Sequence, residues 1–228
     1  MDTGSAKEIK RRPSKMLWEE SFRQISIVAL GLVLWIVFLR VADPKQTDGG
    51  QRLQRATFAG GCFWCMEPVF EGIPGVLETK VGYTGGHVEN PSYEEVCSGK
   101  TGHFEAIQLL YDPEKVSYEE LVKVFLRNID PTDPNGQFCD RGPQYRTAIF
   151  YHDEAQKAIA EKVLRELSDR GLFKEIRTQI LPESRFWPAE DYHQKFYRKN
   201  PLRYAMYKMG CRREERLVEI WKDDIVSK

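Results

Sequence analysis

The sequence lacks an excess of either charge, because 34 lysines and arginines are balanced by 34 aspartates and glutamates. Nucleic-acid-binding domains usually carry a basic surplus, so the overall charge predicts no nucleic-acid partner. Internal repeats and low-complexity segments are also missing. The 228 residues, 41% of them hydrophobic, suffice for one substantial folded domain and an additional segment.

The five cysteines are too few and too irregularly spaced for two common uses. An odd number excludes a complete set of structural disulfides, so at least one thiol is free or pairs only part of the time. A structural zinc site would need a second closely spaced ligand pair beside Cys62 and Cys65. No such spacing is found among His87, His103, Cys97, Cys139 and Cys211. The sequence therefore predicts no bound metal.

Long hydrophobic runs are scarce, and the clearest one is ISIVALGLVLWIVFL at residues 25–39. At about 1.5 Å per residue it spans roughly 22 Å, and the apolar residues beside it lengthen it toward a hydrocarbon core of about 30 Å. Six basic residues precede it. This charge bias predicts a membrane anchor with a cytoplasmic N-terminus and an extracytoplasmic domain, for example in the periplasm.

A cleaved signal peptide and a buried core helix are the alternatives for this run. A small-x-small cleavage site is missing after Leu39, and a core helix of a globular domain usually shows a polar face. We therefore expect an uncleaved anchor. The expected segments are a basic cytoplasmic segment (1–24), the transmembrane anchor (25–42), a polar linker (43–55), a folded catalytic domain (56–222) and a short tail (223–228).

From residue 56 onward, strand and helix signals alternate. Strands are expected at 56–59, 76–83, 104–111, 147–151 and 176–181, and helices at 62–71, 92–97, 117–129, 153–170 and over much of the C-terminal tail. Ser117 and Glu120 have the spacing of a capping box, and Gly171 has the place of a helix C′ residue. The mixed order predicts an α+β domain, a two-layer sandwich of packed helices on a mainly antiparallel mixed sheet with a ferredoxin-like core.

The segment Gly60-Gly61-Cys62-Phe63-Trp64-Cys65 is the most informative one. A strand that leads through two glycines into a helix places Cys62 at the helix N-terminus. There the helix dipole favours an anion, so we expect the pKa of the Cys62 thiol to be lowered. Cys65 follows one turn later, close enough to form a disulfide with Cys62. The pattern indicates a redox-active thiol.

Two ordinary core cysteines would be a coincidence at this junction, but a thioredoxin-like disulfide exchanger is a serious alternative. The bulky Phe63-Trp64 pair between the cysteines argues against it, as does the absence of thioredoxin-like sequence around them. A non-catalytic binding or scaffold module is a further alternative, in which the Cys62 pocket would carry no activity.

Three longer motifs narrow the choice, GCFWCMEPVF, GYTGGHVENPSYEEVCSGKTGHFEAIQLLYDP and DRGPQYRTAIFY. In order and spacing they resemble the signatures of class A peptide-methionine sulfoxide reductases, and the resemblance extends from about Thr57 to Trp221. It implies an enzyme that reduces methionine S-sulfoxide, free or in proteins, to methionine. It implies neither a metal nor an organic cofactor.

The resemblance also implies roles for individual residues. Cys62 matches the nucleophile that becomes a sulfenic acid, and Glu105 matches the acid that protonates the departing oxygen. Because Glu105 lies in an apolar strand, we expect its pKa to be raised. The remaining matches are Tyr93 and Tyr145, which hydrogen-bond the sulfoxide oxygen, Asp140 near the same pocket, and Phe63 and Trp64, which receive the methyl group.

The sulfenic acid must be resolved by a second thiol. Cys65 matches the subgroup of the family with a CxxC motif and is the preferred resolving residue, with Cys211 in the tail as the alternative. Cys97 is interpreted as a structural small hydrophobe, and Cys139 as a bystander or a secondary resolver. The disulfide then requires an external dithiol donor of the thioredoxin type, which would be a periplasmic relay if the domain is exported.

Overall fold

The computed structural model describes residue 1, residues 47–48 and residues 51–225. The predicted anchor lies outside these residues, as do nearly all of the N-terminal segment and most of the linker. Within the described part of the chain, no helix is long and apolar enough to cross a membrane.

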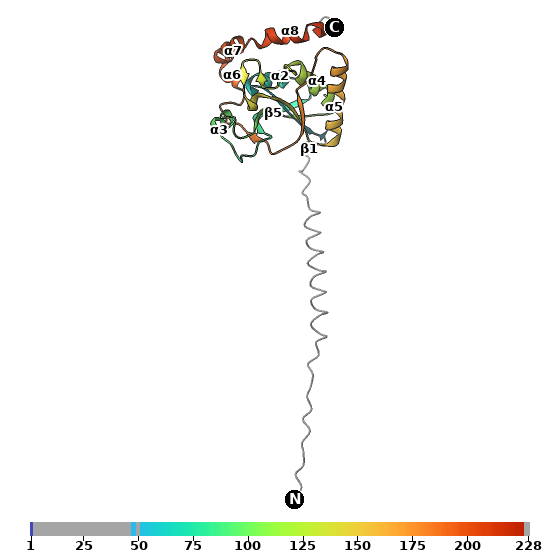
Figure 1. The fold of residues 1–228 in the computed structure, drawn as a ribbon, viewed down its shortest axis with the longest axis vertical. Coiled ribbons are helices and arrows are strands. Elements are labelled where there is room, and N and C mark those ends of the chain that lie inside the picture. Colours follow the sequence, from blue (N-terminus) through green and yellow to red (C-terminus); the bar gives the residue numbers. More distant parts are fainter. Residues whose placement is uncertain (2–46, 49–50, 226–228) are drawn as a thin grey trace. The chain divides into compact units, whose positions relative to one another are not determined.

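A six-stranded sheet lies at the centre of the domain (Figure 1). In spatial order its strands are β10 (Trp187–Pro188), β4 (Val76–Thr84), β5 (Phe104–Tyr111), β3 (Gln54–Gly60), β8 (Thr147–Tyr151) and β9 (Gln179–Pro182). All neighbours are antiparallel except β8 and β9, which are parallel. Two small hairpins stand apart from it, β1 (Thr47–Asp48) with β2 (Gln51–Arg52) and β6 (Gly136–Gln137) with β7 (Asp140–Arg141). The expected α+β class with a mixed sheet is confirmed.

Three helices share one hydrophobic core with the sheet, α2 (Phe63–Phe70), α4 (Tyr118–Arg127) and α5 (Glu154–Asp169). Phe58 of β3 is fully buried in this core, and its ring stacks on Phe70 of α2 at 5.4 Å and on Phe125 of α4 at 4.9 Å between centroids. Side chains alternate between the faces of a strand, so every second residue of β5 points toward the same helices. The core thereby fixes the start of α2 over β5.

Five further helical elements of the described chain complete the domain. They are α3 (Tyr93–Cys97), the 3₁₀ helix η1 (Pro143–Tyr145), α6 (Phe196–Lys199), α7 (Pro201–Gly210) and α8 (Arg213–Ile225). In Figure 1, α7 and α8 form the red margin of the domain near α6, α2 and α4. Trp221 of α8 is buried, and its indole N–H donates to the carbonyl oxygen of Ile129 just after α4, at 3.2 Å. The C-terminal helices therefore belong to the folded domain.

The helix boundaries follow local chemistry. Ser117 caps α4, and Glu120 closes the reciprocal hydrogen bond, as the capping box predicts. Ser92 and Glu95 form the same box at α3. Gly171 adopts a φ of 67° after α5, a conformation that glycine takes at no steric cost.

The sequence missed the shorter pairings. The strand expected at 176–181 is β9, which begins three residues later at Gln179. The segment Asp130–Tyr145, which lies between the expected helix 117–129 and the expected strand 147–151, contains the hairpin β6–β7 and η1. Strand β10 was not predicted, because it has two residues and depends on pairing with Tyr83 and Gly82, about one hundred residues earlier. Such pairings leave no local periodicity.

Replacing Phe58 with alanine tests the core. We expect Phe58→Ala to lower the free energy of unfolding by about 3–5 kcal/mol, because it leaves a cavity between two helices and the sheet. Urea titration of residues 51–228, followed by tryptophan fluorescence, measures the loss. Leu77→Ala is the control, since Leu77 is 54% exposed on β4 and should change the stability by less than about 0.5 kcal/mol. Equal losses in the two variants would contradict this description of the core.

Candidate active site

The turn between β3 and α2 sets the position of Cys62 and Cys65. Gly61 has a φ of 78°, and a Cβ atom there would approach the Cβ of Gln137 to 2.5 Å, so this tight turn requires glycine. Cys62 is the N-cap residue of α2 and Cys65 lies in its first turn. Both are buried, with 6% and 4% of their surface exposed.

Glu105 lies directly beneath this helix start. It is on β5, on the face that also carries Ile107 and Leu109 toward the helices, and only 2% of it is exposed. The backbone N–H of Phe63, the first residue of α2, donates to Glu105 Oε2 at 3.0 Å. Burial raises the pKa of Glu105 from 4.5 to about 8, although this hydrogen bond opposes the shift. The expected raised pKa is confirmed, and the carboxyl group holds a proton at neutral pH.

The expected lowering of the Cys62 pKa is wrong. Burial raises the pKa of the Cys62 thiol well above its usual value, and its hydrogen bond to Cys65 and the negative potential of Glu105 act in the same direction. The hydrogen bond from Cys62 lowers the pKa of Cys65, and the buried cation Arg213 adds to that effect. The helix N-terminus alone does not produce a Cys62 thiolate here, because desolvation is the larger effect.

Tyr93 and Tyr145 converge on Glu105 from two different elements. Tyr93 begins α3 and Tyr145 ends η1. The thiol of Cys97 is in hydrogen-bonding contact with both tyrosine hydroxyls. Burial, and then the potential of neighbouring groups that include Glu105, raises the pKa of each tyrosine, so both hydroxyls stay protonated. Cys97, interpreted from the sequence as a structural hydrophobe, thus lies beside the polar groups of the site.

Phe63 and Trp64 differ in their surroundings. Phe63 is 1% exposed and packs against Tyr83 and His193, so it belongs largely to the core. Trp64 is half-buried and stacks on Phe196 of α6 with 3.7 Å between centroids. Its indole N–H donates to His193 Nδ1 at 2.9 Å. The site therefore has an aromatic wall beside the thiols.

The segment after residue 190 supplies the site residues that sequence reasoning missed. The imidazole of His193 is 1% exposed, and burial lowers its pKa to about 4. Tyr204 and Tyr207 of α7 lie beside the thiols of Cys65 and Cys62, and burial together with these neighbours raises the pKa of each tyrosine. The only sequence signal for this set was a helical tail rich in aromatic and basic residues, which does not indicate which side chain turns inward.

Asp140 lies on β7, half-buried beside Tyr207, whose hydroxyl donates to Asp140 Oδ2. Burial raises the pKa of Asp140, although this hydrogen bond and the charge of Arg213 oppose the shift. The structure thus brings Asp140 to the same thiols as the C-terminal helix α7.

The other two cysteines are bonded to each other. Cys139 and Cys211 form a disulfide with 4.9 Å between their Cα atoms, and Cys62, Cys65 and Cys97 are free. Cys211, the alternative resolving residue, therefore has no thiol in this state, and neither does Cys139. Their sulfur atoms lie within 4.8 Å of a carboxylate oxygen of Asp140, but a disulfide offers no thiolate to a metal ion.

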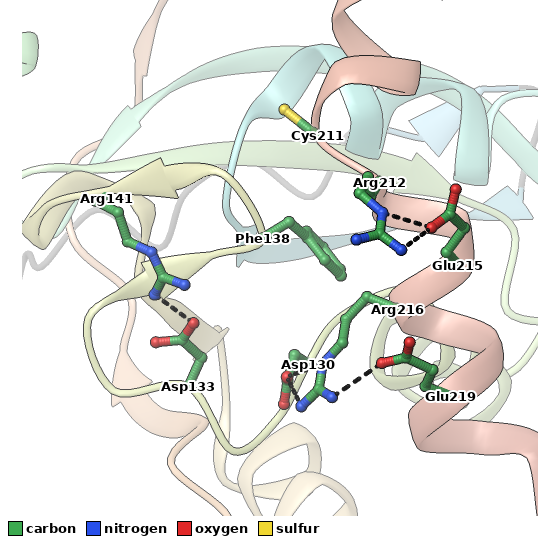
Figure 2. A pocket seen from close by; sticks show the side chains of 9 residues that line it. All are labelled: Asp130, Asp133, Phe138, Arg141, Cys211, Arg212, Glu215, Arg216 and Glu219. Carbon is green, nitrogen blue, oxygen red and sulfur yellow. Dashed lines mark hydrogen bonds and ion pairs between the residues drawn. The ribbon is translucent and has the colours of Figure 1, made fainter.

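A separate cavity of about 360 Å³ lies beside this disulfide (Figure 2). Ion pairs line it, with Arg141 on Asp133, Arg212 on Glu215, and Arg216 between Asp130 and Glu219. Figure 2 shows Cys211 at its edge and Phe138 inside. Cys62, Cys65 and Glu105 are not among its lining residues, so this cavity is not the thiol site.

Comparison with known proteins identifies the class to which this fold and thiol site belong. The family model "Peptide methionine sulfoxide reductase" matches residues 54–225. The chain belongs to the peptide methionine sulfoxide reductase family.

Individual relatives support this assignment. The chain is 51% identical over 172 residues to a peptide methionine sulfoxide reductase MsrA of Bacillus licheniformis, which covers 75% of this chain and 95% of that protein. It is 49% identical over 167 residues to MsrA 2 of Staphylococcus aureus, with 73% and 94% covered.

Two solved structures share the fold. Methionine sulfoxide reductase A of Corynebacterium diphtheriae is 35% identical with a TM-score of 0.60, and the match covers 71% of this chain and 78% of that one. Reduced Mxr1 of Saccharomyces cerevisiae is 33% identical with a TM-score of 0.62, with 70% and 92% covered.

The raised pKa of Glu105 makes a prediction for stability. The folded protein keeps a proton on Glu105 up to about pH 8, whereas the unfolded chain releases it near 4.5. The unfolded state thus binds fewer protons in between, and this group's contribution destabilises the fold as pH rises from about 4.5 to 8. Glu105→Gln should therefore gain stability relative to the wild type over that range, on the order of a few kcal/mol at pH 8.

Urea titrations of both proteins at pH 4, 6 and 8 measure this difference. The two stability curves should approach each other at the low end of the range and separate as pH rises. A constant difference at all three pH values would show that Glu105 has an ordinary pKa.

Proposed function

We propose that this protein reduces methionine S-sulfoxide to methionine through a sulfenic acid on Cys62. The observation that supports this most strongly is the juxtaposition at the start of α2. A buried thiol, a carboxyl group that holds its proton near pH 7 and two protonated tyrosine hydroxyls share one water-poor site. Membership of the family supports the same reaction.

The first step is attack of the Cys62 sulfur on the sulfoxide sulfur. Protonated Glu105 gives its proton to the sulfoxide oxygen, and the hydroxyls of Tyr93 and Tyr145 donate hydrogen bonds to that oxygen. The attack forms a bond between the two sulfur atoms. The protonated oxygen then moves from the methionine sulfur to the Cys62 sulfur as this sulfur–sulfur bond breaks. Methionine leaves with the electron pair of the broken bond, and Cys62 becomes a sulfenic acid. A proton donor is needed because an unprotonated oxygen is a poor group to transfer.

Trp64 and His193 are suited to hold the substrate. Since His193 Nδ1 accepts the hydrogen bond of Trp64, the neutral ring carries its proton on Nε2. Among the described residues that buried nitrogen has no hydrogen-bond partner, and Glu190 Oε2 lies 3.9 Å from it, beyond hydrogen-bonding distance. We assign it to a polar group of the substrate backbone, while the half-buried face of Trp64 contacts the methyl group on sulfur. Selectivity for the S epimer then follows from shape around the chiral sulfur.

Cys65 is the residue that we assign to the second step. It is hydrogen-bonded to Cys62, and its pKa is lowered by that bond and by Arg213, which favours the nucleophilic thiolate. Attack of Cys65 on the sulfenic acid gives a Cys62–Cys65 disulfide and water. A thioredoxin-like dithiol returns both cysteines to thiols. Resolution by Cys211 would first require reduction of its bond to Cys139.

An assay with separate sulfoxide epimers tests this function. The full chain in detergent is given the S or the R epimer with either dithiothreitol or thioredoxin and its reductase. We expect turnover of the S epimer only and no activity in Cys62→Ser. Cys65→Ser should keep turnover with dithiothreitol, which reduces a sulfenic acid directly, and lose turnover with thioredoxin.

Cys97→Ser is the control, because it removes a free thiol that takes no part in the disulfide steps. Its serine hydroxyl can still hydrogen-bond Tyr93 and Tyr145, so turnover with both reductants should be kept. Reduction of insulin disulfides without reduction of either epimer would instead identify a thiol–disulfide oxidoreductase. If Cys65→Ser retains turnover with thioredoxin, the resolving thiol is Cys211.

We further propose that residues 25–42 anchor the enzyme in a membrane with the N-terminus in the cytoplasm. The uncharged run and the six basic residues before it support this topology. Protease treatment of spheroplasts that express the full chain should degrade the catalytic domain while a cytoplasmic marker protein survives. Protection of the domain until the membrane is lysed would place it in the cytoplasm.

A further inference from the structure

A buried Cys62 thiol with a raised pKa has to lose its proton before or during its attack on the sulfoxide. Glu105 is not available as the base, because the proposed reaction uses it in its protonated form. The first step therefore needs a second group that accepts a proton next to the Cys62 sulfur.

The hydroxyl of Tyr207 lies between such a group and the thiol. It donates to Oδ2 of Asp140, and the Cys62 thiol lies close enough to raise the pKa of Tyr207. Its ring contacts Trp64 edge-on, with 5.8 Å between centroids, which holds the ring at the wall of the site. Three groups from three separate elements, the start of α2, the middle of α7 and β7, thus meet at this point, and the Tyr207–Asp140 hydrogen bond ends beside the Cys62 thiol.

We propose that Tyr207 is a catalytic residue that carries the Cys62 proton to Asp140. This inference rests on the function proposed above. The Cys62 S–H bonds Cys65 in the resting site, so it first turns toward Tyr207. As the sulfur attacks, the Cys62 S–H proton moves to the Tyr207 oxygen and the Tyr207 O–H proton moves to Asp140. Asp140 ends protonated and Tyr207 unchanged. Glu105 has given its proton to the departing oxygen, so the site as a whole neither gains nor loses a proton in this step.

The covalent structure supports this assignment. The disulfide joins Cys139, the residue before Asp140, to Cys211, one helical turn after Tyr207. It therefore holds the proton acceptor and the carrier next to each other. Burial raises the pKa of Asp140, which makes its carboxylate a stronger base than an exposed one.

Other charged groups face this proton route as well. The titratable groups around Cys62, Tyr207 and Asp140 are Cys65, Glu105, Arg141, Tyr204 and Arg213. Cys65 accepts a hydrogen bond from Cys62 and is the competing proton acceptor. A test in a Cys65→Ser background removes that competitor and leaves the route through Tyr207 intact.

The measurement is the rate of methionine formation in a single turnover without reductant, using the full chain in detergent with Cys65→Ser. We expect Tyr207→Phe to lower this rate about 100-fold at pH 7, the size typical of a lost general base. Asp140→Asn should cause a similar loss, and the double variant should lose no more than either single one, because both act on one proton route.

The pH dependence separates proton transfer from a merely structural role. Between pH 6 and 8 the rate of the parent should stay nearly flat, whereas that of Tyr207→Phe should rise about tenfold per pH unit, since its thiol must ionise to solvent. Tyr197→Phe is the matched control and should keep the parent's rate. Tyr197 lies in the neighbouring helix α6, and its hydroxyl donates to the carboxylate of Glu71. The control variant therefore also removes a hydroxyl that bonds a carboxylate.

Two results would overturn the inference. One is a Tyr207→Phe rate within twofold of the parent at pH 7, and the other is a double-variant loss equal to the product of the two single losses. The proposed function itself is judged on the parent alone. If the parent forms no methionine from the S epimer, the reduction fails as a whole, whereas an active parent with an equally active Tyr207→Phe refutes only the proton route.

Discussion

The hydrogen bond from the Phe63 amide to Glu105 is the contact on which the rest of the site depends. It joins the first turn of α2 to the central strand β5, at a point where both partners are withdrawn from water. A helix start has unpaired N–H groups, and a buried carboxyl group needs a donor. Each satisfies the other, so the Cys62 thiol beside them has a fixed position relative to the carboxyl proton.

Burial at this contact keeps both reacting groups protonated, which helps the reaction at one group and hinders it at the other. It keeps a proton on Glu105, which is the form required to protonate an oxygen, and it keeps a proton on Cys62, which is the form that does not attack. A site of this kind therefore needs a proton donor and a separate proton acceptor, both close to the Cys62 sulfur. The C-terminal helix α7 and the hairpin β6–β7 supply groups of the right kind from the opposite side.

What the sequence predicted depended on the range of the interactions. The alternating strand and helix signals predicted the strands β3, β4, β5 and β8. The capping box of Ser117 and Glu120 predicted the start of helix α4. Both kinds of signal act within a few residues. The raised pKa of Glu105 followed from its apolar strand. The direction predicted for Cys62 was wrong because the helix N-terminus is visible in the sequence, whereas the burial of the thiol is a property of the whole fold.

The contacts of the C-terminal segment could not be predicted for the same reason. Tyr207 and Asp140 are 67 residues apart, and Cys139 and Cys211 are 72 residues apart. Neither spacing has a period that indicates contact. The family resemblance predicted that Asp140 lies near the pocket. Only the structure shows that α7 brings a tyrosine to each of the two buried thiols.

The same helix also bears on how the disulfide of the second step is reduced. Cys62 and Cys65 are buried, so a protein dithiol reaches them only if part of the cover moves. Within the described residues, α7 itself contains no buried residue, and Leu202, Met206 and Met209 on it are more than 70% exposed. It therefore has little apolar burial to hold it, and segments with few buried contacts open at the lowest free energy. Its inward contacts include the approach of Tyr204 and Tyr207 to the two thiols, the hydrogen bond of Tyr207 to Asp140 and the bond of Cys211 to Cys139 at its end. Once Cys62 and Cys65 have joined in a disulfide, neither sulfur carries a proton or a negative charge, and both tyrosine contacts weaken. Oxidation of the thiols thus removes part of what holds α7, while the Tyr207–Asp140 hydrogen bond and the Cys139–Cys211 disulfide still attach it.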